Sequence, residues 1–352
     1  MEIATTTSPR NTVFVTGATG YIGGAVCRVF ARAGWRVFGL VRNPEAIDDL
    51  IADEVIPIVG SISKEPNFLN ELYKHTQTFD VIISCTEAVP FCHHYEGIST
   101  VLELLSKTSN EKGVKPLVLM TSSCKDYGTT SLHGAPDLVP HTETTPLGPP
   151  GFLHERTFTS LKALEHSDLF DAAILRPTPL FGYGSSYCGL MFEVAAASIS
   201  SDAKPSLDIP ADFSTILHSC HIDDCAAAYL ALATHAEKDR VSVAGECFNI
   251  SGRRYETLGE VAGSLAREYG FVGGAREVPP GTVPVARAAL FGFSQWVDSS
   301  KIRELTGWSD KRALLSEDLS IYRGAYEVAV AKADEGVRRV RQRAIKVWGE
   351  LV

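Results

Sequence analysis

The sequence predicts an α/β protein in which a parallel sheet is covered by helices on both faces. Through the first half of the 352 residues, short apolar or β-branched segments alternate with segments of helical periodicity, a pattern typical of parallel sheets. A glycine-rich turn, residues 17–23, directly follows the first of these segments. Beyond about residue 180 the alternation becomes irregular. Together these features favour a doubly wound, Rossmann-type sheet with a smaller C-terminal substrate-binding domain.

The strands are predicted from short apolar runs bounded by Gly, Pro, Asn or Ser, and the helices from the spacing of apolar residues. The sheet strands lie at residues 12–16, 35–41, 55–59, 81–85, 117–122 and 172–176, with two further short strands at 220–222 and 247–250. Helical periodicity is found at residues 22–33, 68–75, 97–108, 156–167, 185–197 and 224–236, and in the charged stretch 323–352. In that last stretch we expect the charges to form a solvent-exposed helix face.

Two domains are expected from this pattern. The Rossmann-type domain comprises residues 11–182 plus about 216–250, and the substrate-binding domain comprises about 183–215 and 251–352. The Pro/Gly-rich stretch 136–151 is predicted to be a long loop inside the first domain, and loops of that length are usually functional. The polar stretch 201–210 is also predicted to be a loop.

Composition excludes several classes of function. Lys and Arg number 33 against 42 Asp and Glu, which leaves a net charge of −9, so nucleic acids and anionic membranes are poor partners. The eight cysteines form no CxxC pair and no zinc-ligand spacing, so no metal site is expected. Most of the cysteines lie scattered inside apolar runs, and such buried thiols favour a reducing compartment. No apolar run is long enough to span a bilayer. We therefore expect a cytoplasmic protein.

The turn after the first strand has the glycine spacing of a dinucleotide-binding loop. Gly17 permits the tight turn, Gly20 lets the backbone approach a pyrophosphate, and Gly23 lets the helix pack on the sheet. Thr19, Tyr21 and Ile22 complete the loop and open the helix, whose N-terminus favours an anion. The competing interpretation is a tight turn without a ligand.

The end of the second strand bears on the choice of cofactor. An NAD-binding fold usually carries Asp or Glu there to bond the ribose 2′-OH, whereas this chain has Arg42 and Asn43. The guanidinium of Arg42 fits a 2′-phosphate, so the sequence favours NADP(H). A solvated surface arginine is the alternative.

Several further motifs resemble one known family, the extended short-chain dehydrogenases/reductases of the NAD-dependent epimerase/dehydratase group. The motifs are TGATGYIG (16–23), LMTSS followed by YG (119–123, 127–128), LRPT with FG (175–178, 181–182), HIDD (221–224), FNI (248–250), and DSSK with GW (298–301, 307–308). The resemblance implies that Pro177 lies beside the nicotinamide. It also implies that Ser61 and Ile62 lie by the adenine, with Ser61 where the family often has Asp.

The resemblance also implies a catalytic Ser, Tyr and Lys, with Tyr four residues before Lys on one helix. Ser123 and Lys162 match the serine and the lysine, but Phe158 stands where the tyrosine belongs. Phenylalanine has no proton to transfer. His154, one helical turn earlier, is a candidate replacement if the helix begins that early; the alternative is a loop or capping residue at the end of the proline-rich segment. Tyr127 is a second candidate, although the resemblance implies a mainly structural or substrate-contacting role for a tyrosine at this place.

Three functions remain open at this point. The first is an NADP(H)-dependent reductase acting on a carbonyl or conjugated carbonyl of a small organic molecule. The second is a non-redox isomerase, epimerase, lyase or cyclase that retains NADP(H) as a structural or electrostatic cofactor. The third is a nucleotide-sensing regulator. Glu87, after the fourth strand, is either an acid–base group or a solvent-facing residue. The family resemblance suggests a homodimer formed through helices 97–108 and 156–167.

Overall fold

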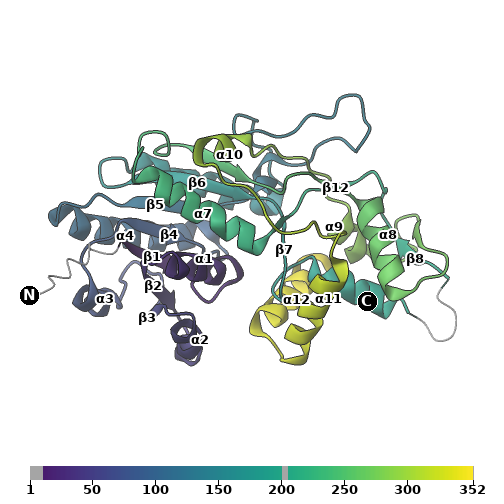
Figure 1. Ribbon diagram of the computed structural model, residues 1–352, viewed down its shortest axis with the longest axis horizontal. Coiled ribbons are helices and arrows are strands. Elements are labelled where there is room, and N and C mark those ends of the chain that lie inside the picture. Colours follow the sequence, from purple (N-terminus) through teal and green to yellow (C-terminus); the bar gives the residue numbers. More distant parts are fainter. Residues whose placement is uncertain (1–10, 200–204, 352) are drawn as a thin grey trace, which may run out of the picture.

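The computed structural model describes residues 11–199 and 205–351 and contains a seven-stranded, wholly parallel sheet (Figure 1). The strand order is β11-β6-β5-β4-β1-β2-β3. The bounds are β1 (Thr12–Thr16), β2 (Arg36–Val41), β3 (Ile56–Val59), β4 (Val81–Ser84), β5 (Leu117–Thr121), β6 (Asp171–Pro177) and β11 (Cys247–Ile250). The predicted Rossmann-type fold is confirmed.

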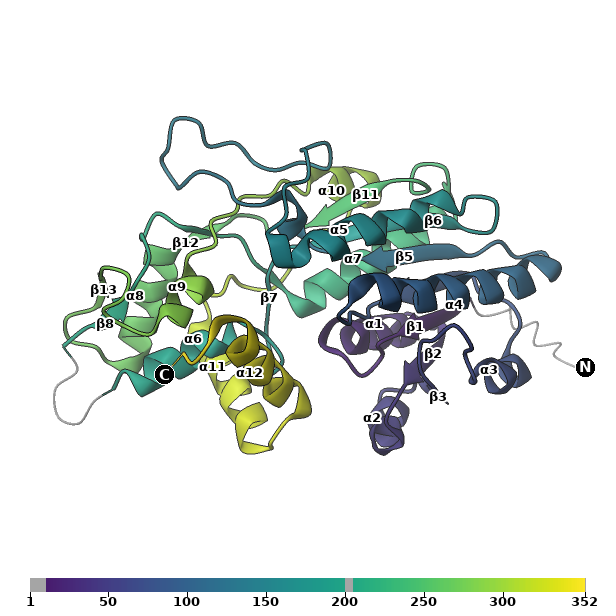
Figure 2. The ribbon, with the colours of Figure 1, turned by 180° about the vertical axis from the view of Figure 1, so that it is seen from behind.

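Helices cover both faces of this sheet because alternate strand residues point in opposite directions. Val13 and Val15 of β1 pack in the cluster that includes α1 (Tyr21–Arg32) and α7 (Ile222–Ala236). Phe14 points to the other face, where its ring stacks on Phe68 at 5.8 Å and meets Phe79 edge-on at 6.2 Å. That face is covered by α3 (Leu69–His75), α4 (Phe91–Glu111) and α5 (His154–Leu161), as Figure 2 shows.

The strand order reverses between β1 and β4, which lie side by side with Thr16 opposite Ser84. Crossover connections leave in opposite directions from such a point, so the topology predicts a crevice at the carboxyl ends of the two strands. The glycine-rich turn follows β1 and residues 85–87 follow β4. This topology therefore predicts where a ligand binds.

The C-terminal part has a hydrophobic cluster of its own. It joins α6 (Gly189–Ala197), α8 (Leu258–Tyr269), α9 (Val285–Phe291), α11 (Leu319–Ala331) and α12 (Glu335–Trp348). Short strand pairs flank it: β7 (Leu180–Phe181) with β10 (Cys220–His221), β8 (Leu207–Ile209) with β13 (Ala275–Glu277), and β9 (Ile216–Leu217) with β12 (Glu256–Thr257). The remaining elements are α2 (Ile47–Ala52), α10 (Ser300–Thr306) and four 3-10 turns, η1 (Pro44–Ala46), η2 (Cys124–Tyr127), η3 (Gly151–Leu153) and η4 (Lys162–Glu165). The domain boundaries given above remain a prediction.

Some predicted elements differ from those observed. The loop prediction for 201–210 is wrong at Leu207–Ile209, which pairs in parallel with β13, because a three-residue strand has no periodicity to detect. Residues 201–204 lie outside the described residues. The helix predicted at 97–108 begins already at Phe91, and the one predicted at 156–167 begins at His154 and changes to the 3-10 turn η4 after Leu161. The predicted loop 136–151 contains no helix or sheet strand up to residue 150, and Gly151 begins the 3-10 turn η3.

None of the helices within residues 11–199 and 205–351 combines the length and the apolar character needed to cross a bilayer.

Gly23→Ala should destabilise the fold, because a Cβ at Gly23 would overlap the Gly17 carbonyl, with the Gly17 carbonyl carbon 2.7 Å away. Overpacking of this kind costs about 1–3 kcal/mol. Gly263→Ala is the matched control inside α8, since its nearest neighbour is the mobile end of Arg267 at 3.5 Å. That change should stabilise the protein by about 0.5–1 kcal/mol through helix propensity. Urea unfolding measures both, and equal effects would contradict the close packing of α1 on the turn.

Candidate active site

The glycine turn presents unpaired backbone donors at the start of α1. Gly17 has φ +71°, and the Gly20 N–H donates to the Gly17 carbonyl at 2.8 Å. Gly20 caps α1 without any side-chain acceptor, and the first turn of the helix carries no acidic residue. No side chain within the described residues therefore caps the first N–H groups of α1, where the positive end of the helix dipole lies. This arrangement fits a phosphate group.

A cavity of about 820 Å³ lies beside this turn. Four of the residues predicted to bind cofactor line it: Thr19, Gly20, Tyr21 and Arg42. Gly17, Ile22 and Gly23 belong to the same turn and helix start. Pro177 ends β6 in the core. Ser61 and Ile62 follow β3 outside the lining of this cavity, with Ser61 exposed and Ile62 packed against the cluster around Phe14.

Arg42 is exposed at the rim of this cavity. Within residues 11–199 and 205–351, no carboxylate forms an ion pair with its guanidinium. Glu45 and Asp49, which the sequence analysis did not consider, line the same cavity. The carboxylate of Glu45 accepts a hydrogen bond from Asn43 Nδ2 at 3.2 Å. Arg42 is thus available to an anionic ligand.

Three of the predicted catalytic residues lie along one side of α5 and the first residue of η4, which directly follows it. His154 is the first residue of this helix, so His154, Phe158 and Lys162 follow one another at intervals of one turn. All three are exposed; Phe158 is 43% exposed, and its ring lies 4.7 Å from that of His154. The early helix start required for His154 to lie on this side is confirmed.

The opposite face of α5 is bonded to the turn that carries Ser123. Ser123 is half-buried, and its hydroxyl accepts the Lys125 N–H at 3.1 Å, which starts η2. Three residues further on, Asp126 is completely buried. Its carboxylate accepts hydrogen bonds from Ser122 Oγ (2.5 Å), Thr157 Oγ1 (2.8 Å) and Arg156 Nη2 (2.6 Å).

Arg176 of β6 is a second cation beside Asp126, with its Nε 3.5 Å from Asp126 Oδ2. Two guanidinium groups therefore surround one buried carboxylate, and α5, β5 and β6 meet at this point. Sequence reasoning missed this cluster. The sequence offered one signal, an acid (Asp126) two residues before Gly128 of the YG motif. It could not reveal the partners of Asp126, because tertiary packing brings them together.

Tyr127 belongs to the same buried network rather than to the exposed face. Its hydroxyl donates to Asn249 Oδ1 at 2.8 Å and accepts from Arg176 Nη1 at 2.9 Å. Burial raises the pKa of the Tyr127 phenol above its usual value. Its bond to Asn249 joins β11 to the turn that carries Ser123. This position suits a structural role better than proton transfer.

Glu87 neither stands alone nor simply faces solvent. Its carboxylate lies 3.7 Å from Arg156 Nη1 and forms an ion pair with Arg343 of α12. The charged side chains of α12 are largely exposed, as expected, but several of them also contact the rest of the protein. Arg341 pairs with Glu193 at 2.7 Å, and Arg339 donates to the Thr19 carbonyl at 3.3 Å. These contacts form because the helix lies against the crevice, which its amphipathic pattern does not reveal.

Lys125 is a cation that the sequence analysis did not single out. It follows Ser123 by two residues, and its ammonium nitrogen lies 4.6 Å from the ring centre of Phe293, in the C-terminal part. Burial, followed by the charge of Arg156, lowers the pKa of this ammonium. No carboxylate within the described ranges forms an ion pair with it. A substrate oxygen bearing negative charge would be stabilised beside it.

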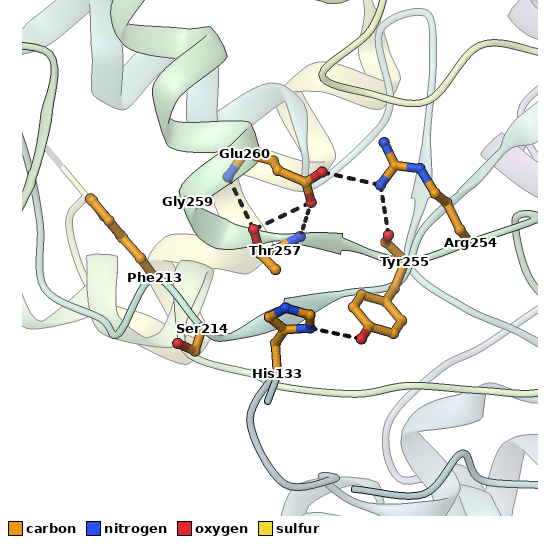
Figure 3. Close-up of a pocket in the computed structure, with 8 residues that line it drawn as sticks. All are labelled: His133, Phe213, Ser214, Arg254, Tyr255, Thr257, Gly259 and Glu260. Atoms are coloured by element: carbon orange, nitrogen blue, oxygen red, sulfur yellow. Dashed lines mark hydrogen bonds and ion pairs between the residues drawn. The ribbon is translucent and has the colours of Figure 1, made fainter. Parts of the chain in front are cut away.

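A second cavity, of about 590 Å³, lies between the loop after η2 and the start of α8 (Figure 3). His133 Nδ1 and the Tyr255 hydroxyl lie 2.8 Å apart, and Arg254 pairs with Glu260 at 3.2 Å. Glu260 also completes the capping box of α8 with Thr257. Most of the polar groups drawn here bond one another, and none of the predicted site residues lines the cavity, so we do not assign this cavity to the reaction.

Comparisons with known proteins agree with this architecture. Maize (Zea mays) dihydroflavonol 4-reductase is 25% identical over 133 residues, which are 37% of this chain and 35% of that relative; the match thus spans about a third of the relative's length. Bacillus anthracis dTDP-glucose 4,6-dehydratase superposes with a TM-score of 0.69, at 18% identity over 94% of this chain and 99% of the other. Bifidobacterium longum UDP-glucose 4-epimerase, solved with NAD+ and UDP, gives a TM-score of 0.62, at 16% identity over 93% and 100%. At these identities the two structures show a shared fold.

The sequence model of the NAD dependent epimerase/dehydratase family matches residues 13–251, which include the glycine turn, the turn that carries Ser123, α5 and β11. That match covers more than half of the chain, and the protein belongs to the NAD-dependent epimerase/dehydratase family.

Proposed function

We propose that the protein is an NADP(H)-dependent oxidoreductase that reduces a carbonyl or conjugated carbonyl of a small organic molecule. The proposal rests chiefly on one observation: α5, which carries His154 and Phe158 on its exposed side and leads directly into Lys162, is fixed to the Ser123 turn by the buried bonds of Arg156 and Thr157 to Asp126. The cradle at α1 fits a dinucleotide phosphate, and family membership supports a nicotinamide cofactor. Such a cofactor supplies hydride when bound.

The residues of this chain then have distinct tasks. The Ser123 hydroxyl binds the substrate oxygen, and the ammonium of Lys125 stabilises negative charge that develops on it. Lys162 holds the nicotinamide ribose, in line with its match to the family lysine. His154, oriented by its contact with the Phe158 ring, donates the proton to the substrate oxygen. Phe158 itself forms an apolar wall.

Phe158 also supports a second candidate function. A scaffold without the tyrosine hydroxyl suits a non-redox isomerisation, elimination or cyclisation, in which the dinucleotide is bound but not consumed. The relatives named as an epimerase and a dehydratase make this the main competitor. The third candidate is a nucleotide-sensing regulator, which would bind the dinucleotide without forming a product in the tests below.

The cofactor preference should depend on Arg42. Purified protein titrated with NADPH and NADH should bind NADPH at least about tenfold more tightly, the equivalent of about 1.4 kcal/mol. Arg42→Asp should abolish or reverse this preference, because a carboxylate repels the 2′-phosphate and accepts a ribose hydroxyl. Arg32→Asp, an exposed change at the end of α1 outside the cavity, is the matched control. Equal affinity of the native protein for both cofactors would contradict the assignment.

The reaction class should show in the fate of the hydride. With NADPH deuterated at C4, product should carry deuterium and cofactor should be oxidised in proportion to product. His154→Ala should lower kcat about 10²–10⁴-fold, as loss of a general acid does, while the exposed control His93→Ala should not. Product formed without cofactor oxidation would replace the reductase by the non-redox candidate. Label transfer with an unaffected His154→Ala variant would remove His154 as the acid.

A further inference from the structure

The C-terminal helix α12 forms one wall of the cavity at the dinucleotide cradle. Gly336, Arg338 and Arg339 line it together with Thr19 and Arg42, about 300 residues earlier in the sequence. In Figures 1 and 2, α11 and α12 lie on the same side of the molecule as α1 and α2. The wall therefore comes from the C-terminal part, outside the residues matched by the family model.

Two arginines of α12 contact the two segments that border the crevice. Arg339 Nη2 donates to the carbonyl of Thr19, in the glycine turn after β1, at 3.3 Å. Arg343, one helical turn later, pairs with Glu87, in the segment after β4. Residues four apart lie on one face of a helix. One face of α12 thus spans the crevice from the glycine turn to the end of β4.

The charges in the cavity leave a place for an additional anion. Several lining charges already have partners: Arg28 pairs with Asp53, Asp334 caps α12 through the Val337 N–H at 3.0 Å, and Glu335 pairs with Arg338. Glu45 accepts a hydrogen bond from Asn43, and Asp49 forms no ion pair with a described residue. Arg42 has no carboxylate partner among the residues that the structure describes. Arg339 is held loosely, 4.0 Å from Glu335 and by its bond to one carbonyl.

We propose that Arg339, assisted by Arg338, completes a phosphate monoester subsite opposite Arg42, so that the 2′-phosphate of NADP(H) is held between the sheet and α12. This inference rests on the NADP(H) assignment proposed above. A guanidinium has five donors in a planar fork, and the single carbonyl contact leaves most of them for phosphate oxygens. Arg42 alone would give an exposed, weak contact; a second cation from α12 would couple cofactor binding to closure of the C-terminal part.

The test uses pairs of nucleotides that differ by one phosphate. Calorimetric titration of the full chain compares adenosine 2′,5′-bisphosphate with 5′-AMP, and ADP-ribose reports on the pyrophosphate. Arg339→Gln, and Arg338→Gln/Arg339→Gln, should weaken the bisphosphate about tenfold or more, and leave 5′-AMP and ADP-ribose within about twofold. Lys346→Gln, in the last turn of α12, is the matched control.

A second readout is amide hydrogen exchange. The bisphosphate should slow exchange in the first half of α12 of the native protein, and this protection should be lost in Arg339→Gln. Native affinity in both arginine variants would overturn the inference, as would an equal loss for ADP-ribose, which would place the arginines on the pyrophosphate. Failure of the NADP(H) assignment gives a different result, since the native protein itself would then bind bisphosphate and 5′-AMP equally.

Discussion

The geometry of the active site depends on the buried carboxylate of Asp126. It joins the end of β5 to α5 through Arg156 and Thr157, and to β6 through Arg176. A buried ion pair contributes little net stability relative to apolar packing, but loss of one partner leaves an uncompensated charge and costs several kcal/mol. The cluster therefore acts as a geometric constraint: α5 can pack only where its arginine reaches the carboxylate, and this fixes where His154, Phe158 and Lys162 face.

The same network extends to the cofactor crevice. Arg156 reaches Glu87 after β4, and Glu87 in turn pairs with Arg343 of α12. Glu87 stands at the mouth of the crevice, where an unpaired carboxylate would repel a dinucleotide, and two guanidinium groups compensate its charge. The contact of α12 with the glycine turn and the contact of α5 with the Ser123 turn are thus connected through one chain of charged groups.

Much of the fold could be predicted because its signals are local. The strands are short apolar runs, and the glycine turn is set by backbone requirements at Gly17 and Gly23 that any side chain would violate. The sequence also predicts the helix that contains Phe158, and it shows that Phe158 stands where the family has its catalytic tyrosine. The Asp126–Arg156 pair spans 30 residues and the Glu87–Arg343 pair spans 256. Such pairs follow from tertiary packing, so an isolated Asp or Arg in the sequence could equally be a surface charge. Helix α8 was missed although its capping box, Thr257 with Glu260, was present in the sequence.

The central claim is that the Asp126–Arg156 pair holds α5 on the turn that carries Ser123. A double-mutant cycle tests it most directly, with urea unfolding of the native protein, Asp126→Asn, Arg156→Gln and the double variant. Asp126→Asn should cost about 3–5 kcal/mol, because it removes the carboxylate that faces both Arg156 and Arg176. Arg156→Gln should cost about 1.5–3 kcal/mol, because Arg176 still faces Asp126. The double variant should be at least about 1 kcal/mol more stable than the sum of the two losses predicts. Losses that add to within about 0.5 kcal/mol would show that the two groups act independently and would contradict the account.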